Sequence, residues 1–294
     1  MSILIDEETR VVVQGLTGYQ AQSDTEYCMK YGTKVVGGVV PGRSGQTLLG
    51  LPLFNTMAEA VGAVGANTSA VYVAARGAKD SIVEAAHAGI KLILTITEKV
   101  PYRDFSQAYH IAHRLGARIV GPNSNGIISP GKSKIGILGN IPHYFMPGPV
   151  GIISRSGGMN HEIGHLLTKH GLGQSTCVSI GGDPMVGTTI RDALELFEQD
   201  DETQIVMLYC EPGGRMEEDA AELVRAGGFS KPLVAYVAGL FMEQMPEGIP
   251  FGHAGAIIEG TVGRPTVKKK ILAENGVHVV ERLSAIPSLL RRLI

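Results

Sequence analysis

Two histidines, His161 and His165, stand four positions apart in the stretch HEIGH, with Glu162 directly after the first. On a helix, this H-E-x-x-H spacing places two zinc ligands and a general base on one face, as in zinc proteases. The segment SRSGG precedes it at once, so the motif would occupy the first turns of a helix that Gly164 weakens. No convincing third ligand is marked in the sequence. We therefore expect no metal here and keep a zinc hydrolase as an alternative that metal analysis would test.

The segment before this helix suits an anion better than a metal. A strand that ends in SRSGG, residues 154–158, and opens a helix presents several backbone N–H groups at the positive end of the helix dipole. Such a turn favours a phosphate or a carboxylate. The two histidines would then be partly exposed helix residues close to an anion site.

A third histidine, His253, lies in the loop PFGHAGAII, where small neighbours leave its imidazole accessible from several sides. A neutral imidazole can attack phosphorus through one ring nitrogen when a carboxylate holds the proton on the other. Glu211 follows the predicted strand Ile205–Tyr209, and we assign it to this task. The alternative interpretation of His253 is a mobile surface residue.

Two glycine-containing segments resemble phosphate-binding loops. Gly15 and Gly18, in VVVQGLTGYQ, form a bare turn between a predicted strand and helix, which suits a phosphate at the helix N-terminus. The third glycine of GxGxxG is missing, so a nucleotide-type ligand and a structural turn both stay open. The segment GIISPGKS, Gly126–Ser133, matches the P-loop pattern, but an apolar, glycine-broken stretch follows instead of a helix. A P-loop NTPase is therefore a weaker alternative.

The composition is that of an ordinary globular protein with room for about two domains. The chain has 294 residues, of which 44% are hydrophobic and 18% are charged. A net charge of −2 gives no electrostatic reason to expect nucleic acid or an anionic membrane as a partner. The run Lys268–Lys270 predicts a solvated helix face.

Three cysteines, Cys28, Cys177 and Cys210, are too few and too scattered for a disulfide framework or a metal cluster. We expect each to be a small core residue in a reducing compartment. The N-terminus lacks a basic segment followed by an apolar run, and nowhere do about 18 uncharged apolar residues occur together. A cytoplasmic protein is the resulting expectation.

Short β-branched runs alternate with helix-like segments, which predicts an α/β fold with parallel sheets and crossover helices. Strands are expected in the first half at Val11–Val13, Lys34–Val40, Ala70–Val73, Lys91–Ile96 and Arg118–Val120. Helices are expected between them at Thr25–Tyr31, Thr56–Val64, Asp80–Ala88 and Asp104–Leu115. A second series has strands near Val150–Ser154, Ser175–Ile180, Ile205–Tyr209 and Leu233–Val237.

Between the two series lies a stretch, residues 121–148, that is rich in Gly and Pro and has no helix period. We place the domain junction there, with a first domain at 1–125, the junction at 126–148 and a second domain at 149–294. Ligands of doubly wound sheets bind at the carboxyl ends of the strands, so chemistry is expected in the loops that follow them.

Several segments resemble, in the same order and near the same spacing, the α subunit of succinyl-CoA synthetase, also named succinate–CoA ligase. They are GLTGYQ, YGTKVVGGVVPGR, GLPLFNT, TITE, GPNSNGIISPGK, VGIISRSGG, GLGQSTCVSIGGDP and FGHAGAII. The resemblance covers nearly the whole chain, and GQSTCV-x-IGGDP together with GHAGAII is highly specific for this family.

The resemblance implies an N-terminal Rossmann-like CoA-binding domain followed by a flavodoxin-like ligase domain with a transiently phosphorylated histidine. The family is an acid–thiol ligase: ATP or GTP phosphorylates the histidine, the phosphoryl group passes to a carboxylate, and the CoA thiol then displaces phosphate. The nucleotide and Mg²⁺ would bind to a separate ATP-grasp β subunit in an αβ or α2β2 assembly. This implication agrees with the lack of a credible nucleoside triphosphate site here.

The resemblance also assigns residues by motif. His253 would be the phosphohistidine and Glu211 its orienting partner. The turn that stabilises the phosphate would consist of Ser154, Ser156, Gly157 and Gly158. The residues lying along CoA would be Thr17, Gly18, Tyr19, Gln20, Arg43, Ile96, Thr97 and Glu98. His161, with its neighbour Asn160, falls where the family has a tyrosine near the carboxylate substrate.

Departures from the family pattern lie at the acid-binding end. The family usually reads SGTLTYE where this chain reads SGGMNHE, so Gly158 replaces a threonine. SRSGGM and FGHAGA also resemble the ligase half of ATP citrate lyase, in which the paired glycines help to hold citrate. Succinate is the default substrate, and malate, citrate or another hydroxy or branched acid is the alternative. With no citryl-lyase domain before Ile294, a citrate version would be expected to stop at citryl-CoA.

Two further departures concern CoA. Arg43 replaces a lysine and keeps the positive charge for the CoA phosphates. Ser124 and Asn125 stand where the family often has Cys-Pro or Cys-Ala, near the expected position of the CoA thiol, and the sequence assigns no role to Asn125. A binding module that keeps CoA recognition without catalysis is a last alternative, against which the presence of both His253 and Glu211 argues.

Overall fold

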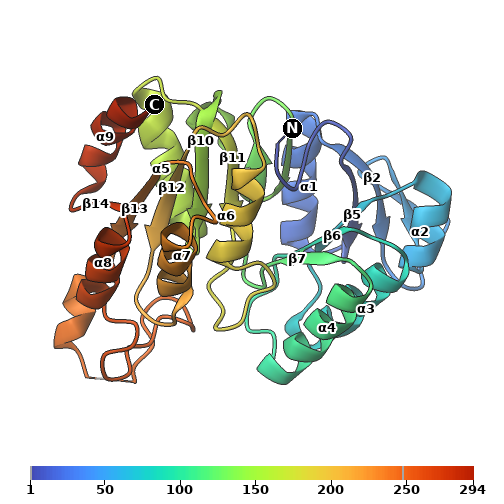
Figure 1. The fold of residues 1–294 in the computed structure, drawn as a ribbon. Helices are drawn as coiled ribbons and strands as arrows, with labels where there is room; N and C mark the ends of the chain where they lie inside the picture. The colour runs from blue at the N-terminus through green and yellow to red at the C-terminus, as the bar shows by residue number, and fades with distance from the viewer. Residues whose placement is uncertain (1, 247) are drawn as a thin grey trace.

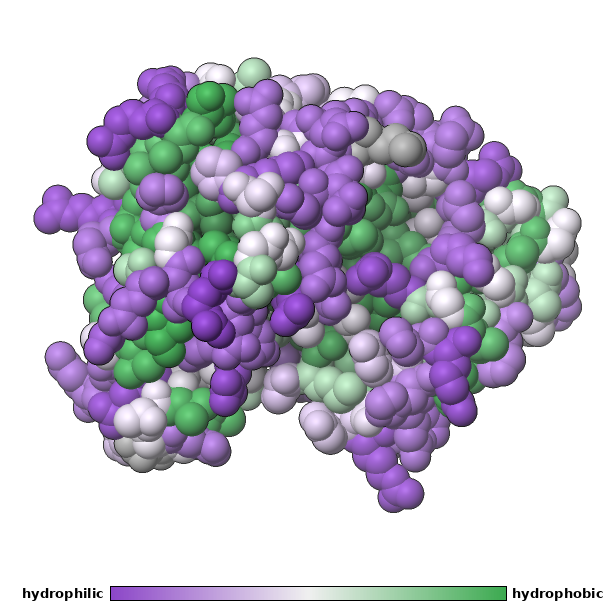
Figure 2. All heavy atoms as spheres, in the orientation of Figure 1, coloured by the Kyte–Doolittle hydropathy of each residue, from purple (hydrophilic) through white to green (hydrophobic). Residues whose placement is uncertain are grey.

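The computed structural model describes residues 2–246 and 248–294, and this part of the chain forms two α/β halves that lie side by side (Figure 1). The N-terminal half, blue to green, contains one seven-stranded sheet, and the C-terminal half, green to red, contains another. The molecule is hollowed along its lower edge between the two halves (Figure 2). The α/β fold with parallel-dominated sheets, predicted from the alternation of strands and helices, is confirmed.

The first sheet has the strand order β3-β4-β2-β1-β5-β6-β7, and all its pairs are parallel except β3 with β4. The chain moves outwards from β1 to β2 and β4 and then returns to the other side of β1 with β5. The carboxyl ends of β1 and β5 therefore flank a topological switch point. The strands are β1 (Arg10–Gln14), β2 (Lys34–Val39), β3 (Thr47–Leu48), β4 (Leu51–Phe54), β5 (Thr68–Val71), β6 (Leu92–Thr95) and β7 (Arg118–Val120).

Helices cover both faces of this sheet. They are α1 (Tyr19–Tyr31), α2 (Met57–Val64), α3 (Ala75–His87) and α4 (Tyr102–Arg114). Small and aliphatic residues of α2, α3 and α4, among them Ala60 and Ile82, form the core on one face. α1 lies on the other face, where Ala21 and Cys28 belong to a second buried cluster.

The helix α1 begins at Tyr19, and the predicted start at Thr25 is wrong. The additional turn is polar, so no apolar period marked it. Polar contacts hold it instead: the fully buried Asp24 accepts hydrogen bonds from Gln20 Nε2 at 2.9 Å and from the Tyr72 hydroxyl at 3.1 Å. A buried carboxylate surrounded by hydrogen-bond donors therefore takes the place of apolar packing at this helix end.

The helix α3 likewise begins at Ala75 instead of the predicted Asp80. Its first turn contains a glycine, and its N-cap, Ala74, offers no side-chain hydrogen bond, so neither propensity nor a cap marked the start. By contrast, α2 begins directly after Thr56, whose hydroxyl accepts a hydrogen bond from the Glu59 N–H at 3.2 Å.

The second sheet has the order β14-β13-β12-β10-β11-β8-β9. Its strands are β8 (Gly126–Ser129), β9 (Ser133–Gly136), β10 (Pro147–Ser154), β11 (Gln174–Ser179), β12 (Ile205–Cys210), β13 (Leu233–Val237) and β14 (His278–Val280). Its helices are α5 (Gly157–Lys169), α6 (Ile190–Glu198), α7 (Met216–Arg225), α8 (Pro265–Glu274) and α9 (Ile286–Leu293), with 3-10 turns η1 (Pro142–Tyr144), η2 (Leu240–Gln244) and η3 (Leu283–Ala285). Residues of α5 and α9 pack on one face, and residues of α6, α7 and α8 on the other.

The stretch between the two predicted series contains a hairpin that the sequence did not indicate. β8 and β9 pair antiparallel, and β8 attaches this hairpin antiparallel to β11. The P-loop match lies within the hairpin, and Lys132 at its turn is ion-paired with Glu202 at 2.7 Å. Since no helix follows the match, the P-loop alternative is wrong. The domain division at residues 125 and 149 stays a proposal.

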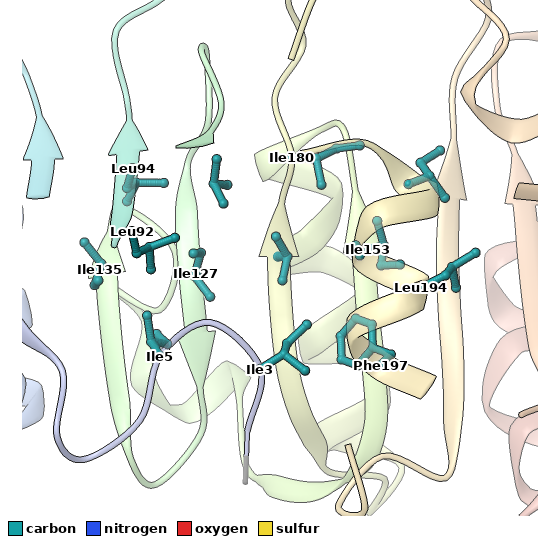
Figure 3. Packing of buried hydrophobic residues seen from close by; sticks show 14 of the residues in the cluster. Ile3, Ile5, Leu92, Leu94, Ile127, Ile135, Ile153, Ile180, Leu194 and Phe197 are labelled. Atoms are coloured by element: carbon teal, nitrogen blue, oxygen red, sulfur yellow. The ribbon is translucent and has the colours of Figure 1, made fainter. Parts of the chain in front are cut away.

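One apolar cluster is shared by the two halves. In Figure 3, Ile5 of the N-terminal segment points towards Ile127 of β8 and Ile135 of β9. Ile3 lies towards Phe197 of α6 in the same view, and residues of β6 complete the group. Because buried side chains of both sheets pack in one cluster, the loops at the carboxyl ends of the two sheets are held in a fixed relation.

Lys268 is fully buried, so the prediction of a solvated helix face is wrong at this residue. Its Nζ donates to Glu217 Oε2 at 2.6 Å and to Glu218 Oε2 at 2.9 Å, both on α7. Lys270, two residues later, has 73% of its side chain exposed and shows the predicted behaviour. A run of lysines does not reveal which member faces a neighbouring helix.

Cys28, Cys177 and Cys210 are all free and buried, as predicted for small core residues. Burial raises the pKa of the Cys177 thiol well above its ordinary value, which disfavours the reactive thiolate. None of the described helices combines the length and the apolar character that a membrane crossing requires.

Candidate functional site

The second sheet has its switch point at β10, which lies between β11 and β12 and is parallel to both. The chain leaves β10 for α5 and β11 on one side and later crosses to β12 on the other. The loops that follow β10 and β12 therefore diverge at the carboxyl edge, where doubly wound folds place their ligands. Ser156 opens α5 on one side of this crevice, and Glu211 follows β12 on the other.

His253 and Glu211 meet at this edge. Nδ1 of His253 lies 2.7 Å from Oε2 of Glu211. An ionised carboxylate only accepts hydrogen bonds, so Nδ1 carries the hydrogen, and Nε2 of the neutral imidazole keeps its lone pair. The Glu211 side chain is 9% exposed and that of His253 is 26% exposed. A mostly buried carboxylate thus orients a histidine that solvent still reaches.

Glycines allow the loop of His253 to lie this close to its neighbours. A Cβ on Gly182 would come within 2.5 Å of the His253 ring, and a Cβ on Gly213 would overlap the carbonyl oxygen of Gly255. The N–H of Gly255 also donates to the carbonyl of Gly182 at 3.2 Å. The IGGDP, CEPGG and GHAGA segments are therefore in direct contact, and glycine is required where they touch.

A pocket of about 240 Å³ lies beside the histidine–carboxylate pair. Its wall includes His253, Glu211 and Ser156, the last being the N-cap of α5. Phe241 and Phe251, whose ring centroids are 5.0 Å apart, belong to the apolar part of the wall. One small volume is therefore bordered by a nucleophilic nitrogen, a carboxylate and the positive end of a helix, which suits the transfer of an anionic group.

The turn SRSGG opens α5 as predicted. Ser156 Oγ accepts a hydrogen bond from the Met159 N–H at 3.3 Å. Ser154 is fully buried, and its hydroxyl donates to the Ser156 carbonyl at 2.6 Å, so it stabilises the turn from inside. Gly158 is exposed, and the nearest atom to a Cβ built there lies 3.9 Å away. The first backbone N–H groups of a helix have no intrahelical partner, and at Gly158 no side chain of the described residues covers this helix end.

Two asparagines lie at the same helix end. The amide of Asn125 lies so close to Gly157 that a Cβ there would overlap it. This amide is partly exposed, and it makes no hydrogen bond within the described residues. Asn160 is fully buried, and its Nδ2 donates to Ser179 Oγ at 3.4 Å. Its position is therefore beneath the turn rather than at the solvent face.

The H-E-x-x-H stretch lies in the first turns of α5. The backbone N–H of Gly139 donates to His161 Nε2 at 3.4 Å, so Nδ1 carries the hydrogen and donates to the Gly157 carbonyl at 2.9 Å. Both ring nitrogens are therefore in use. The ring of His165 stacks on Tyr144 with centroids 4.0 Å apart. Within residues 2–246 and 248–294, no group of three or more His, Cys, Asp or Glu side chains is arranged to hold a metal.

In the first half, the turn between β1 and α1 consists of residues 15–18. Gly18 is the N-cap of α1 and supplies no side-chain hydrogen bond, which leaves the helix end bare. Tyr19 is 88% exposed, and Gln20 bonds to Asp24 inside the helix. The carbonyl of Thr17 accepts a hydrogen bond from Gln22 Nε2 at 2.9 Å. This bare turn lies at the switch point of the first sheet.

The other predicted ligand residues of this half also follow parallel strands. Arg43 is exposed after β2, and its guanidinium makes no hydrogen bond or ion pair with a described residue. The segment Ile96–Glu98 follows β6, and the Thr97 hydroxyl donates to the Val73 carbonyl at 2.7 Å. A bare helix N-terminus, a free arginine and an exposed tyrosine at one sheet edge are suited to an elongated ligand that carries phosphates.

Two buried charged residues near the His253 loop were not anticipated. Arg155 is 2% exposed, and its Nε and Nη1 have no hydrogen-bond partner in the described part of the chain. Its Nη2 lies so close to Gly255 that a Cβ there would overlap it. Asp183 is 5% exposed, and its Oδ1 likewise lacks a partner there. Their positions inside SRSGG and IGGDP were the available sequence signal.

Comparison with protein families places two models on this chain. A CoA-binding domain matches residues 6–99, and a CoA-ligase domain matches residues 153–280. The first covers the bare turn and the segment Ile96–Glu98, and the second covers Glu211 and His253.

Two similar proteins each cover nearly the whole chain. The α subunit 2 of the ADP-forming succinate–CoA ligase of Archaeoglobus fulgidus is 49% identical over 279 residues, which are 95% of each chain. The α subunit of the malate–CoA ligase of Methylorubrum extorquens is 45% identical over 283 residues, 95% of this chain and 94% of that one. Among solved structures, the ATP citrate lyase of Methanosaeta concilii in complex with (3S)-citryl-CoA superposes with a TM-score of 0.91 at 25% identity, covering 99% of this chain and 50% of that one.

Proposed function

Because the chain belongs to the family of succinate–CoA ligase α subunits, we propose that His253 is the residue that its acid–thiol ligase reaction phosphorylates. The observation that carries this proposal is the 2.7 Å contact between His253 Nδ1 and Glu211 Oε2 beside a pocket at the N-terminus of α5. CoA is the substrate whose binding domain occupies the first half of the chain.

The first step uses the lone pair of His253 Nε2. This nitrogen attacks the γ-phosphorus of ATP or GTP, and the nucleoside diphosphate leaves. Glu211 keeps the hydrogen on Nδ1 and stabilises the positive charge that the imidazole gains as its Nε2–P bond forms. The N-terminus of α5, at Ser156, Gly157 and Gly158, stabilises the negative phosphoryl group. Ser154 supports this turn through its bond to the Ser156 carbonyl.

The next two steps move the phosphoryl group and then replace it. A carboxylate oxygen of the acid attacks the phosphorus, the N–P bond breaks, and His253 is regenerated with an acyl phosphate as product. The CoA sulfur then attacks the acyl carbon, and phosphate leaves with the electron pair of the C–O bond. The free enzyme therefore returns to its neutral, Glu211-bound histidine.

CoA lies along the carboxyl edge of the first sheet. The residues proposed to contact it are Thr17, Gly18, Tyr19, Gln20, Arg43, Ile96, Thr97 and Glu98. The free guanidinium of Arg43 and the uncapped start of α1 support a role with the CoA phosphates. The nucleotide and Mg²⁺ bind to a partner β subunit with an ATP-grasp fold, in an αβ or α2β2 assembly.

The acid is bound in front of α5, near His161 and Asn160. Succinate is the first candidate because the family is named for it, as is the relative from Archaeoglobus fulgidus that is 49% identical. A hydroxy acid such as malate, or a branched acid such as citrate, is the second candidate. Its specific support is the open space at Gly158, where the nearest atom to an added Cβ is 3.9 Å away. A larger or more polar acid fits where a threonine would narrow the site.

The test is phosphate transfer through the purified complex of this chain with its β partner. The complex is incubated with Mg²⁺ and ATP or GTP labelled at the γ-phosphate, and we expect acid-labile label on this chain. CoA is then added with succinate, malate, citrate or itaconate, and the acid that discharges the label identifies the substrate. An intact complex that takes up no label would contradict the phosphohistidine proposal and favour a CoA-binding module.

Replacing Glu211 by glutamine is expected to slow phosphorylation of His253 by about 10²-fold or more. Glutamine occupies nearly the same volume and keeps an acceptor oxygen, but it carries no charge, so it no longer stabilises the positive imidazole. Rapid-quench measurement of label uptake checks this result. Glu195→Gln, an exposed carboxylate on α6, is the matched control and should leave the rate unchanged. Equal rates for Glu211→Gln and wild type would rule out the orienting role.

A further inference from the structure

Asp183 is buried, and one oxygen of its carboxyl group lacks a hydrogen-bond partner among the described residues. It follows β11 in the loop IGGDP, is 5% exposed, and its Oδ1 has no hydrogen-bond partner among the described residues. Leaving an ionised carboxylate oxygen unpaired in the interior costs free energy. An unpaired carboxylate oxygen in a loop of the functional site indicates that a ligand or a reacting group interacts with this residue.

The carboxyl group borders a pocket of about 310 Å³ between the two halves of the molecule. Lys99, Val100 and Tyr102 of the first half line one side, and Asp183, Met185 and Ala254 of the second half line the other. Ala254 directly follows His253, and Lys99 directly follows the segment proposed to lie along CoA. The pocket wall therefore includes neighbours of both proposed sites, between which the thiol end of CoA must pass.

The surroundings make this carboxyl group more basic than an ordinary one. Burial raises the pKa of Asp183, and the nearby Glu98 raises it further. A hydrogen bond from the Asn123 side chain, the electrostatic interaction with His253 and a hydrogen bond from the Val100 N–H lower the pKa, without cancelling the increase. Lys99 is the other charged group on the pocket wall. Nη2 of Arg155 and the backbone carbonyl of Asp183 both lie close to the position that a Cβ on Gly255 would take. A carboxylate whose pKa is raised is a better proton acceptor than a solvated aspartate.

We propose that Asp183 is the general base that takes the proton from the CoA thiol. This inference rests on the proposed function. The thiol of CoA is mostly protonated at pH 7, whereas the thiolate is the nucleophile, so the last step benefits from a base at the sulfur. The S–H proton moves to the Asp183 carboxylate as the sulfur forms its bond to the acyl carbon. The acyl C–O bond breaks, its electron pair leaves with phosphate, and Asp183 then returns the proton to the departing phosphate or to water.

A purely structural role makes different predictions. If Asp183 only connects the two halves through Asn123 and the Val100 N–H, its loss should disturb every step of the reaction at every pH. If Asp183 accepts the thiol proton, its loss should affect only the step that uses CoA, and high pH should compensate. Asp183→Asn separates these cases because the amide keeps the size of the side chain and an acceptor oxygen.

The experiment uses the complex of the full chain with its β partner. Three rates are measured between pH 6 and pH 9.5: label uptake by His253, acid-dependent discharge in the absence of CoA with the acyl phosphate trapped by hydroxylamine, and acyl-CoA formation after CoA is added. We expect Asp183→Asn to retain the first two rates within about twofold. The third should fall about 10²-fold at pH 7 and approach the wild-type rate as the thiol ionises above pH ~8.5.

Asp201→Asn, which makes the same change at an exposed aspartate outside both sites, is the control and should leave all three rates within about threefold of wild type. An Asp183→Asn complex that forms acyl-CoA at the wild-type rate at pH 7 would overturn the inference. So would a loss that is equal for all three steps, or one that pH 9.5 does not relieve. Failure of the wild-type complex to label His253 at all would instead contradict the proposed function, so the two failures are distinguishable.

Discussion

A His253→Ala variant, in complex with the β partner, is expected to incorporate no phosphate above background and to lose at least about 10⁴-fold in turnover. The loss is this large because the proposed reaction is covalent, and no neighbouring group can replace its nucleophile. Glu211 is the nearest candidate, but its carboxylate is 9% exposed and is oriented towards the imidazole. The measurement is label incorporation after incubation with labelled ATP or GTP, followed by steady-state acyl-CoA synthesis.

His278→Ala provides the control for this result. His278 is an exposed residue of β14, at the edge of the sheet, and its replacement should leave phosphorylation and stability unchanged. CoA binding should also survive in His253→Ala, because the CoA-binding domain model covers only residues 6–99. Persistent acid-labile label on His253→Ala would place the phosphoryl group on another residue and remove the basis of the mechanism.

The pairing of His253 with Glu211 was accessible to sequence reasoning for a topological reason. The two residues are separated by 42 positions, yet both lie in loops at the carboxyl edge of one predicted sheet. Parallel strands bring such loops together whatever their distance in the chain. The sequence could predict a contact between this histidine and a carboxylate, because an imidazole acts as a nucleophile when a carboxylate holds the proton on its other nitrogen. It could not predict the distance of 2.7 Å.

The environments of Asp183 and Arg155 could not be predicted from the sequence. Both stand inside segments that the sequence marks as motifs, but burial and missing partners are properties of the packed loops. Nothing in IGGDP indicates that the carboxyl group faces the first half of the molecule rather than solvent. The approach of Gly255 to Arg155 depends in the same way on the path of a loop more than ninety residues further along the chain.

The sequence failed to indicate secondary structure where polar or non-local contacts, and not an apolar pattern, hold the element. The first turn of α1 is held by Asp24, which Gln20, Tyr72 and Asn140 surround with hydrogen-bond donors. The hairpin β8–β9 was missed because glycines interrupt its short strands, and because its pairing partner β11 lies about fifty residues away. Propensity describes neither a buried polar network nor a non-local strand pair.

The buried charge of Lys268 links the stability of the second half to its site. Lys268 and Glu217 are both fully buried, and Glu218 completes the cluster at 2.9 Å. Glu217 Oε1 also accepts a hydrogen bond from the backbone N–H of Glu211 at 3.3 Å. The cluster therefore holds the start of the loop that positions the carboxylate beside His253.

Replacing Lys268 by methionine is expected to destabilise the chain by about 3–5 kcal/mol, because it leaves two carboxylates in the interior without their cation. Lys270→Met removes only an exposed pair with Glu274 and should cost about 0–1 kcal/mol. Chemical unfolding of the purified chain measures both values. A Lys268→Met variant as stable as Lys270→Met would show that the buried cluster contributes nothing.

The pH dependence of this contribution follows from the direction of the pKa shift. Burial alone lowers the pKa of Lys268, but Glu217 and Glu218 outweigh it and raise the pKa above its ordinary value of 10.5. A group whose pKa is raised by folding stabilises the folded state below its unfolded pKa and loses this effect as pH rises through the folded pKa. The difference between wild type and Lys268→Met should therefore be constant near neutral pH and decrease only above about pH 10.5. A difference that already decreases at pH 8 would mean that the folded chain holds Lys268 less tightly than its two carboxylates imply.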